Sequence, residues 1–324
     1  MADTLHEQLT KHLADVHAIE EQALQQLRAA PKIAGDEELE RIFREHLAET
    51  EEQERLVRAR LEAGAADPSK LKDLLARGGG LGMVLFARSQ PDTPGKLTAH
   101  AYSYEHLELA AYDMLAGVAD RAQDAQTAAV ARSIRDQESA MARRLAASFD
   151  RAVDASLREV EQDDLTQQLT KYLADAHAIE SQALQLLEQA PSMVREPDLE
   201  KVFREHLEET RSHRAAVGAR LEAHDARPSR FKDVALRIGG LNLGGFFGAQ
   251  PDTPAKLAGF AFAFEHLEVA AYELLLRVAR RAGDEDTARV AERIAGEERA
   301  TAAAIRAQFE PALDAALRAQ GVTA

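Results

Sequence analysis

The sequence predicts an all-α fold in which two tandem four-helix bundles follow one another along the chain. Ala, Leu, Glu, Arg and Gln dominate the 324 residues, only 10 are proline and none is tryptophan. This composition is typical of helical proteins. Hydrophobic residues make up 45% of the chain, which is enough to build cores. The third observation is that long segments of the first half recur in the second.

The internal repeat keeps one register throughout the chain. LTKHLADVHAIEEQAL from Leu9 returns as LTKYLADAHAIESQAL from Leu169, and FREHLAET, QPDTPGKL and EHLELAAY return as FREHLEET, QPDTPAKL and EHLEVAAY. The offset is 160 residues in each case, without a gap. Because this period is far too long for a solenoid unit, each copy is predicted to be a whole domain. The predicted domains are residues 1–161 and 162–324.

Each copy is predicted to contain four long helices and a short fifth one. In the first copy we expect them over 4–29, 36–63, 95–122, 125–149 and 153–160. The first should stop before Pro31, and Asp36 is a candidate N-cap of the second. Asp163 or Asp164 is the corresponding N-cap candidate for the second copy. The connection after the second helix is long, so the second and third helices can run in the same direction; it contains PSKLKDLLAR, a predicted short helix, and a flexible GGGLG.

The core-facing stripe of each helix carries an acid near its middle. In the first copy the inward polar residues are Glu20, His46, Glu49, Glu105, Glu108 and Glu138. In the second copy they are Glu180, His206, Glu209, Glu265, Glu268 and Glu298. A buried carboxylate must be protonated, paired or bound to metal. Four helices that direct acids to one level of a core form the arrangement that holds two metal ions.

A polar layer held by hydrogen bonds or salt bridges is the alternative to a metal site. Arg44, Arg132 and Lys96 are candidate partners for the acids, but they fall off the inward stripes. Taken alone, His46 would be better interpreted as a satisfied core histidine. Because it stands beside Glu49 and other inward acids, we favour a metal ligand.

These motifs resemble the ferritin-like superfamily and, more closely, the YciF/YciE-like stress-protein family within it. The resemblance rests on HAIEEQAL, HLAET or HLEET, EHLE followed by AAY, and the acid of the fourth helix, in this order and twice along the chain. It implies ferritin-like bundles that bind iron or manganese as a di-metal site, with zinc also compatible. By analogy with ferritins, the ligands from the successive helices of the first copy would be Glu20, then His46 and Glu49, then Glu105 or Glu108, then Glu138.

The chain departs from standard di-iron bundles, which carry Glu-x-x-His on two helices. The second helix has the reverse order, His46-x-x-Glu49, and no histidine follows Glu138 three residues later. The second copy adds His213 where the first copy has Gln53. We therefore expect the second copy to be the better imidazole site. The aromatic positions Tyr112 and Tyr272 are expected to pack and to hydrogen-bond to the carboxylates.

The charge and the missing cysteine limit the classes of function. A net charge of -15 disfavours nucleic acid and anionic membranes as partners. Without cysteine there is no disulfide, no thiolate metal site and no cysteine nucleophile, so a metal would need oxygen and imidazole ligands. No apolar run is long enough for a bilayer and the N-terminal segment lacks a signal-peptide core, so a cytoplasmic location is the default expectation.

Two functions from different classes fit these observations. The first is a metal-binding protein linked to oxidative or general stress and metal handling, whose open coordination positions would react with oxygen or peroxide. It would then be an oxidoreductase of the ferroxidase or peroxide-consuming type. The second is a non-catalytic stress or interaction protein that keeps the bundle without a functional metal site. A single-copy relative could pair as a homodimer, so we expect the fused copies to pack as an internal pseudo-dimer.

Overall fold

The computed structural model describes residues 4–64, 93–226 and 252–322, and it contains no strand within these ranges. The first copy consists of α1 (Leu5–Ile33), α2 (Glu37–Gly64), α5 (Pro94–Arg121), α6 (Ala125–Ala147) and the short α7 (Phe149–Leu157). The second consists of the 3-10 turn η1 (Gln162–Asp164), α8 (Leu165–Leu187), α9 (Ala190–Met193), α10 (Pro197–Ala223), α12 (Thr253–Arg281), α13 (Glu285–Arg306) and α14 (Phe309–Ala319). The predicted all-α fold of two tandem four-helix bundles is confirmed.

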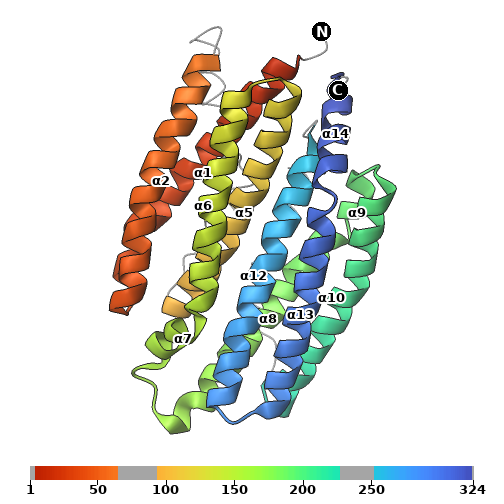
Figure 1. The fold of residues 1–324 in the computed structure, drawn as a ribbon. Coiled ribbons are helices and arrows are strands. Elements are labelled where there is room, and N and C mark those ends of the chain that lie inside the picture. Colours follow the sequence, from red (N-terminus) through yellow and green to blue (C-terminus); the bar gives the residue numbers. More distant parts are fainter. Residues whose placement is uncertain (1–3, 65–92, 227–251, 323–324) are drawn as a thin grey trace.

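In each bundle the second and third helices run in the same direction, as the colours of α2 and α5, and of α10 and α12, show in Figure 1. The first helix packs against the second and third, and the fourth packs against the third and second. The long connections between the second and third helices lie outside the described residues. These include the segments PSKLKDLLAR and GGGLG, so the predicted short helix there is not described.

Most helix ends follow local sequence signals. The carboxylate of Asp36 accepts a hydrogen bond from the backbone N–H of Leu39 at 3.2 Å and so caps α2, as expected. Asp164 occupies the N-cap position of α8 but makes no side-chain cap bond there, because the turn η1 leads directly into the helix. The short fifth helix begins earlier than predicted, at Phe149.

Pro31 gives one correction to the predicted helix ends. The sequence predicts that the first helix stops before this residue, but α1 continues through it to Ile33. Proline removes one hydrogen bond and crowds the carbonyl four residues before it, and here this disturbs only the last turn of α1, where Ala30 stays buried. In the second copy the helix does end early, at Leu187, and Pro191 lies in the first turn of the separate short helix α9.

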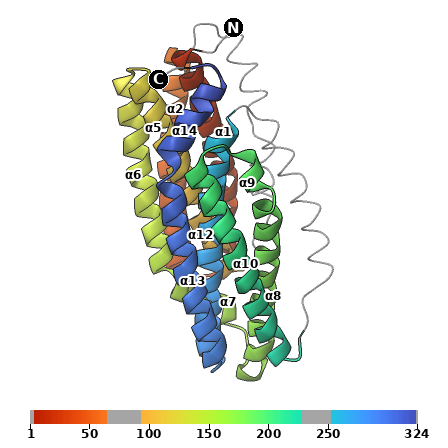
Figure 2. The same cartoon turned by 90° about the vertical axis from the view of Figure 1, so that its right-hand side faces the viewer.

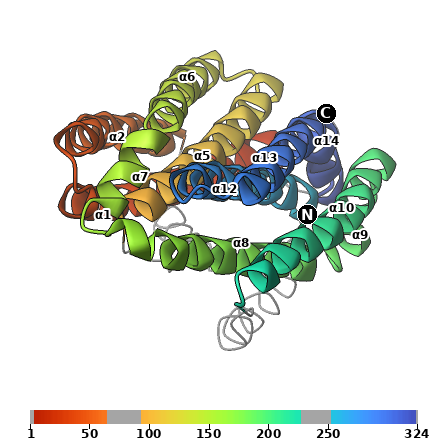
Figure 3. The same ribbon diagram turned by 90° about the horizontal axis from the view of Figure 1, so that it is seen from below.

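The two bundles pack against each other through their third helices, α5 and α12. These two helices lie next to each other in the middle of the molecule (Figures 2 and 3). Equivalent residues of the two copies meet there. The imidazole rings of His106 and His266 stack with their centroids 3.4 Å apart and an interplanar angle of 14°. The hydroxyl of Ser103 donates a hydrogen bond to the backbone carbonyl of Ala263 at 2.7 Å. Contacts between equivalent residues occur at a two-fold axis.

Contacts away from this axis come in matched pairs. Lys96 Nζ lies 3.4 Å from Asp175 Oδ2, and the equivalent atoms of Lys256 and Asp15 lie 3.3 Å apart. Each fifth helix packs against the third helix of its own bundle and also contacts that of the other, α7 with α12 and α14 with α5. These reciprocal contacts fit the internal pseudo-dimer that the sequence predicts.

Two apolar layers enclose the polar level of the first bundle. One contains Leu13, Val57 and Leu115, and the other contains Phe43 and Leu145. All of these side chains are buried. Charged groups between such layers are removed from water, which sets the electrostatics of the site. No helix in the described part of the chain is long and apolar enough to cross a membrane.

Candidate metal centres

The first bundle gathers one imidazole and three carboxylates from α2, α5 and α6. Nε2 of His46 lies 3.2 Å from Glu105 Oε1 and 3.6 Å from Glu138 Oε2. Glu108, one turn after Glu105, completes the group. Each of the four side chains offers a ligand atom, and these atoms lie within 4.8 Å of one another. All four residues are buried in the core.

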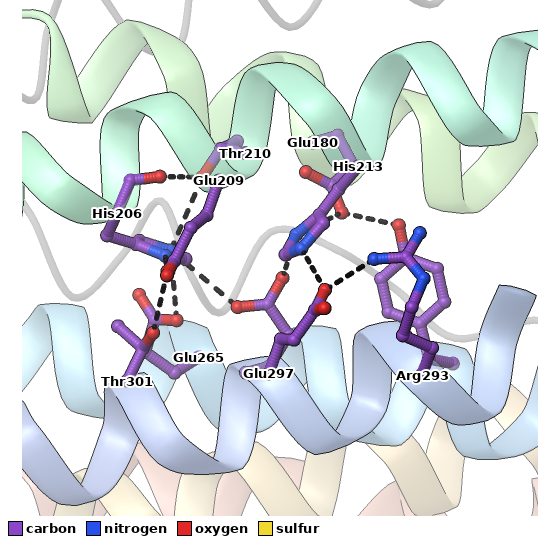
Figure 4. A network of polar contacts seen from close by, with 11 residues as sticks. Glu180, His206, Glu209, Thr210, His213, Glu265, Arg293, Glu297 and Thr301 are labelled. Carbon is purple, nitrogen blue, oxygen red and sulfur yellow. Dashed lines mark hydrogen bonds and ion pairs between the residues drawn. The ribbon is translucent and has the colours of Figure 1, made fainter.

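The second bundle repeats this group at the equivalent positions. Figure 4 shows two of its members, His206 and Glu265. Nε2 of His206 lies 3.0 Å from Glu265 Oε2 and 3.7 Å from Glu298 Oε2. Glu268 is the fourth member, and the ligand atoms again lie within 4.8 Å of one another. All four residues are buried.

A second group in this bundle shares Glu298 with the first. His213 Nδ1 lies 2.8 Å from Glu298 Oε1 and 3.8 Å from Glu180 Oε1, and the ligand atoms of the three residues lie within 4.8 Å of one another. Figure 4 shows His213 and His206 on the same face of α10, both directed toward α13. The two oxygens of Glu298 therefore face different imidazoles. This is the geometry of a carboxylate that can bridge two metal ions.

The first bundle lacks this second histidine. Gln53 takes its place, and its side-chain amide donates a hydrogen bond to Gln137 Oε1 at 3.2 Å. In the second copy the corresponding contact joins His213 Nε2 to Glu297 Oε2 at 2.8 Å. The pair Gln53 and Gln137 of the first copy is therefore replaced by His213 and Glu297 in the second. We overlooked Glu297 in the sequence, although comparison of the aligned copies could have found it through this paired change.

Comparison with known families agrees with the two-bundle organisation. The family model of the domain of unknown function DUF892 matches residues 4–158 and again residues 164–318. The chain belongs to this family. The two DUF892 repeats coincide with the two bundles, and the family is ferritin-like. No solved structure matches the chain.

Burial controls the protonation of the acids in both DUF892 repeats. It raises the pKa of Glu20 and of Glu180 to about 8, against an ordinary value of 4.5. It raises the pKa of Glu298 to about 7 and places that of Glu268 well above the ordinary range. For His46, burial alone would lower the pKa, but neighbouring Glu105 and the other acids raise it well above 6.5. Without a bound cation, Glu20, Glu180, Glu268 and Glu298 thus tend to hold protons.

Several buried carboxylate oxygens have no hydrogen-bond partner among the described residues. Both oxygens of Glu268 and the Oε2 atoms of Glu20, Glu108 and Glu180 are in this condition. An unsatisfied buried polar atom costs about 1–3 kcal/mol. Carboxylate and imidazole together form a donor set that suits iron, manganese and zinc. The orphaned oxygens and the chemistry of the donors therefore fit metal ions in the DUF892 cores.

The basic side chains that could have neutralised these acids bind elsewhere. Arg44 pairs with Glu40, and Arg132 pairs with Asp120, both near the surface. The third candidate, Lys96, belongs to the contact between the two bundles described above. The structure thus gives no support to an arginine- or lysine-paired layer among the described residues.

The acids Glu49 and Glu209 differ from the other predicted site residues. Their side chains are 45% and 50% exposed, and each has an oxygen near Nδ1 of its histidine, at 3.3 Å from His46 and 3.4 Å from His206. They stand outside the ligand groups. A carboxylate that accepts a hydrogen bond from Nδ1–H leaves Nε2 free to bind a metal. Their position therefore suits orientation of the imidazoles.

The predicted tyrosine contacts are present in both DUF892 repeats. The hydroxyl of Tyr112 donates to Glu20 Oε1, and that of Tyr272 donates to Glu180 Oε1. These two acids are thereby held against the third helix. His17, which lies one turn before Glu20, points instead to Glu54, with 3.0 Å between His17 Nε2 and Glu54 Oε1.

Proposed function

We propose that the chain is a ferritin-like carboxylate protein that binds iron or manganese in the core of each bundle. The main support for this proposal is the position of Glu298, whose two carboxylate oxygens face the imidazoles of His206 and His213. Zinc is compatible with the same donors, whereas soft thiolate coordination is excluded because the chain has no cysteine. The resemblance to YciF/YciE-like proteins supports a role in oxidative or general stress and metal handling.

We assign the ligands by their place in the buried groups. In the first repeat, taken as residues 1–161, they are His46, Glu105, Glu108 and Glu138, with Glu20 beside them. In the second, residues 162–324, they are Glu180, His206, His213, Glu265, Glu268 and Glu298. Glu49 and Glu209 hold the Nδ1 side of the imidazoles. The second repeat therefore offers the more complete set for two ions.

Bound iron or manganese would supply redox chemistry toward oxygen or peroxide, of the ferroxidase or peroxide-consuming type. Other residues of the chain orient the ligands and shield them from water. Tyr112 and Tyr272 fix the orientation of Glu20 and Glu180. The apolar layers on either side exclude bulk water, which strengthens the attraction between carboxylates and a cation.

Metal content tests the proposal directly. Protein purified without chelator should be reconstituted with Fe²⁺ or Mn²⁺, and its metal measured by mass spectrometry and by anomalous scattering at the iron and manganese edges. We expect at least about one ion per repeat, with the second repeat filled first. The variant E298Q should lose the second-repeat metal, whereas E292Q, in an exposed ion pair with Arg280, should not. Negligible metal in the wild type would favour the non-catalytic interaction protein instead.

A further inference from the structure

A pocket of about 320 Å³ lies against α1, α2 and α5 of the first bundle and reaches the candidate metal group. Gln25 and Ala29, on the exposed side of α1, belong to its wall. At its inner end the wall includes His46 and Glu105, which are buried members of the ligand group. The pocket therefore connects the protein surface with the first cluster.

Among the described residues, the pocket wall has unsatisfied polar atoms but neither lysine nor arginine. The buried atoms Gln22 Oε1 and Gln26 Nε2 have no hydrogen-bond partner among the described residues, so the wall offers one acceptor and one donor. Neither lysine nor arginine occurs among the described residues that line it, whereas Glu105 does. This lining offers an anion no lysine or arginine to pair with. Small uncharged molecules that can both donate and accept a hydrogen bond suit this lining.

The second copy provides an internal comparison because three of its equivalent positions are apolar. Leu186 replaces Gln26, Phe260 replaces His100, and Phe264 replaces Tyr104. The rings of Phe260 and Phe264 lie 6.2 Å apart, and both side chains are buried in the apolar core together with Leu186. Buried apolar side chains thus stand where the first copy has polar pocket walls.

The first helix also ends differently in the two copies at this place. In the first copy α1 continues past Pro31, and Ala30 and Ile33 of its last turn line the pocket. In the second copy α8 ends at Leu187, and the buried residue Ala190, equivalent to Ala30, begins α9. The backbone and the side chains therefore change together around the pocket.

We propose that this pocket admits small uncharged molecules, of the size of hydrogen peroxide or a short alcohol, to the first cluster and that the second cluster is closed to them. A water molecule occupies about 30 Å³ in the liquid, so the volume is sufficient for such molecules. The chemistry at the inner end rests on the proposed function, whereas access itself does not. The more accessible repeat is then the one with fewer imidazole ligands, and the closed repeat is the one with more.

Thiol labelling can measure access because the chain has no cysteine of its own. Ala23, which lines the pocket, and its equivalent Ala183 are 3% and 2% exposed, so A23C and A183C form a matched pair. We expect the uncharged reagent methyl methanethiosulfonate to label metal-free A23C roughly tenfold faster than A183C, since reaction requires access to the thiol. Equal labelling rates in the two folded variants would overturn the proposal.

Exchange of the pocket walls sharpens this test. The substitutions Q26L/H100F/Y104F give the first copy the side chains of the second and should slow labelling of A23C to the rate of A183C. The reverse set L186Q/F260H/F264Y should accelerate labelling of A183C. Circular dichroism and thermal melts check that each variant is folded. If Q26L/H100F/Y104F left the labelling rate of A23C unchanged, the reagent would not reach the thiol through this pocket, and the proposal would be contradicted.

A charged reagent tests the selectivity of the pocket. The anionic 2-sulfonatoethyl methanethiosulfonate should react with A23C more slowly than the uncharged reagent does, relative to their ratio at A129C, an exposed position outside the pocket. A ratio equal to that at A129C would contradict selection for uncharged molecules. Because labelling needs no metal, its result is independent of metal loading. Failure to bind iron or manganese contradicts the proposed function, and equal labelling contradicts the pocket.

Discussion

His213 Nδ1 lies 2.8 Å from Glu298 Oε1, and this contact joins the two ligand groups of the second bundle. Replacement of His213 by glutamine, the residue at the equivalent position Gln53, should weaken Mn²⁺ binding by the second repeat roughly tenfold or more, because it removes an imidazole next to the bridging acid. Isothermal titration calorimetry at pH 7 measures this change.

The control for this prediction is H224Q, because His224 contacts Asp284 and belongs to neither ligand group. Its manganese affinity should equal that of the wild type. The reciprocal double variant Q53H/Q137E rebuilds the second-repeat contact in the first repeat and should strengthen binding there. A wild-type affinity for H213Q would show that His213 is not a ligand.

The metal-free protein should lose stability as the pH rises from 6 to 8. Glu20 and Glu180 ionise near pH 4.5 when unfolded, but burial raises their pKa in the folded protein to about 8. Their protonation thus favours the folded state at low pH, and this contribution is lost as the pH rises toward 8. Urea denaturation of chelator-treated protein at the two pH values measures the effect.

Glutamine keeps the shape of these acids without their proton, so E20Q/E180Q should show a weaker pH dependence than the wild type. Metal loading should reverse the trend, because cations bind the deprotonated ligands more tightly as the pH rises. Equal stability of the metal-free wild type at pH 6 and pH 8 would contradict the raised pKa values.

Removal of the tyrosine hydroxyls should destabilise both cores. Y112F leaves Glu20 Oε1 without its donor, and Y272F does the same to Glu180. We expect a loss of about 1–3 kcal/mol in the free energy of unfolding for each variant without metal. Denaturant titration of Y112F, E20Q and the double variant should reveal a coupling energy between the two residues. Additive losses would show that the hydrogen bond contributes nothing.

Lys256 should matter more to the contact between the bundles than its equivalent Lys96. Lys256 lies within 3.3 Å of Asp15 and 3.0 Å of Asp252, and its side chain is 29% exposed, against 39% for Lys96. K256A leaves two acids in a partly buried place, so we expect a loss of about 2 kcal/mol. K96A should cost about 1 kcal/mol or less. Similar losses, measured by denaturation with urea, would contradict this asymmetry.

The helices and the inward acids could be predicted because both depend on local patterns. Asp36 marks the start of a helix, and the 3.6-residue period places His46 and Glu138 on core-facing stripes. The expected stop before Pro31 follows from the missing N–H of proline and from its clash with the carbonyl four residues earlier. Packing of the last turn of α1, in which Ala30 is buried, is a tertiary effect that this local rule omits.

Other features depend on tertiary contacts that one helix does not encode. Glu49 belongs to an inward stripe by its spacing, but its place at the edge of the stripe leaves the side chain half-exposed. His106 and His266 point away from their own cores, and only the pairing of the bundles brings their rings together. The pocket likewise required knowledge of how Gln26 and Tyr104, from different helices, border one space.

The pairing of α5 with α12 places the two repeats of one polypeptide where two identical subunits could have stood. In a homodimer encoded by a single repeat, every substitution changes both halves at once. Covalent fusion removes this constraint, so Gln53 and His213 can coexist in one molecule, as can Tyr104 and Phe264. Duplication within one chain therefore allows one repeat to be open to small molecules and the other to be closed to them, while both keep the shared interface.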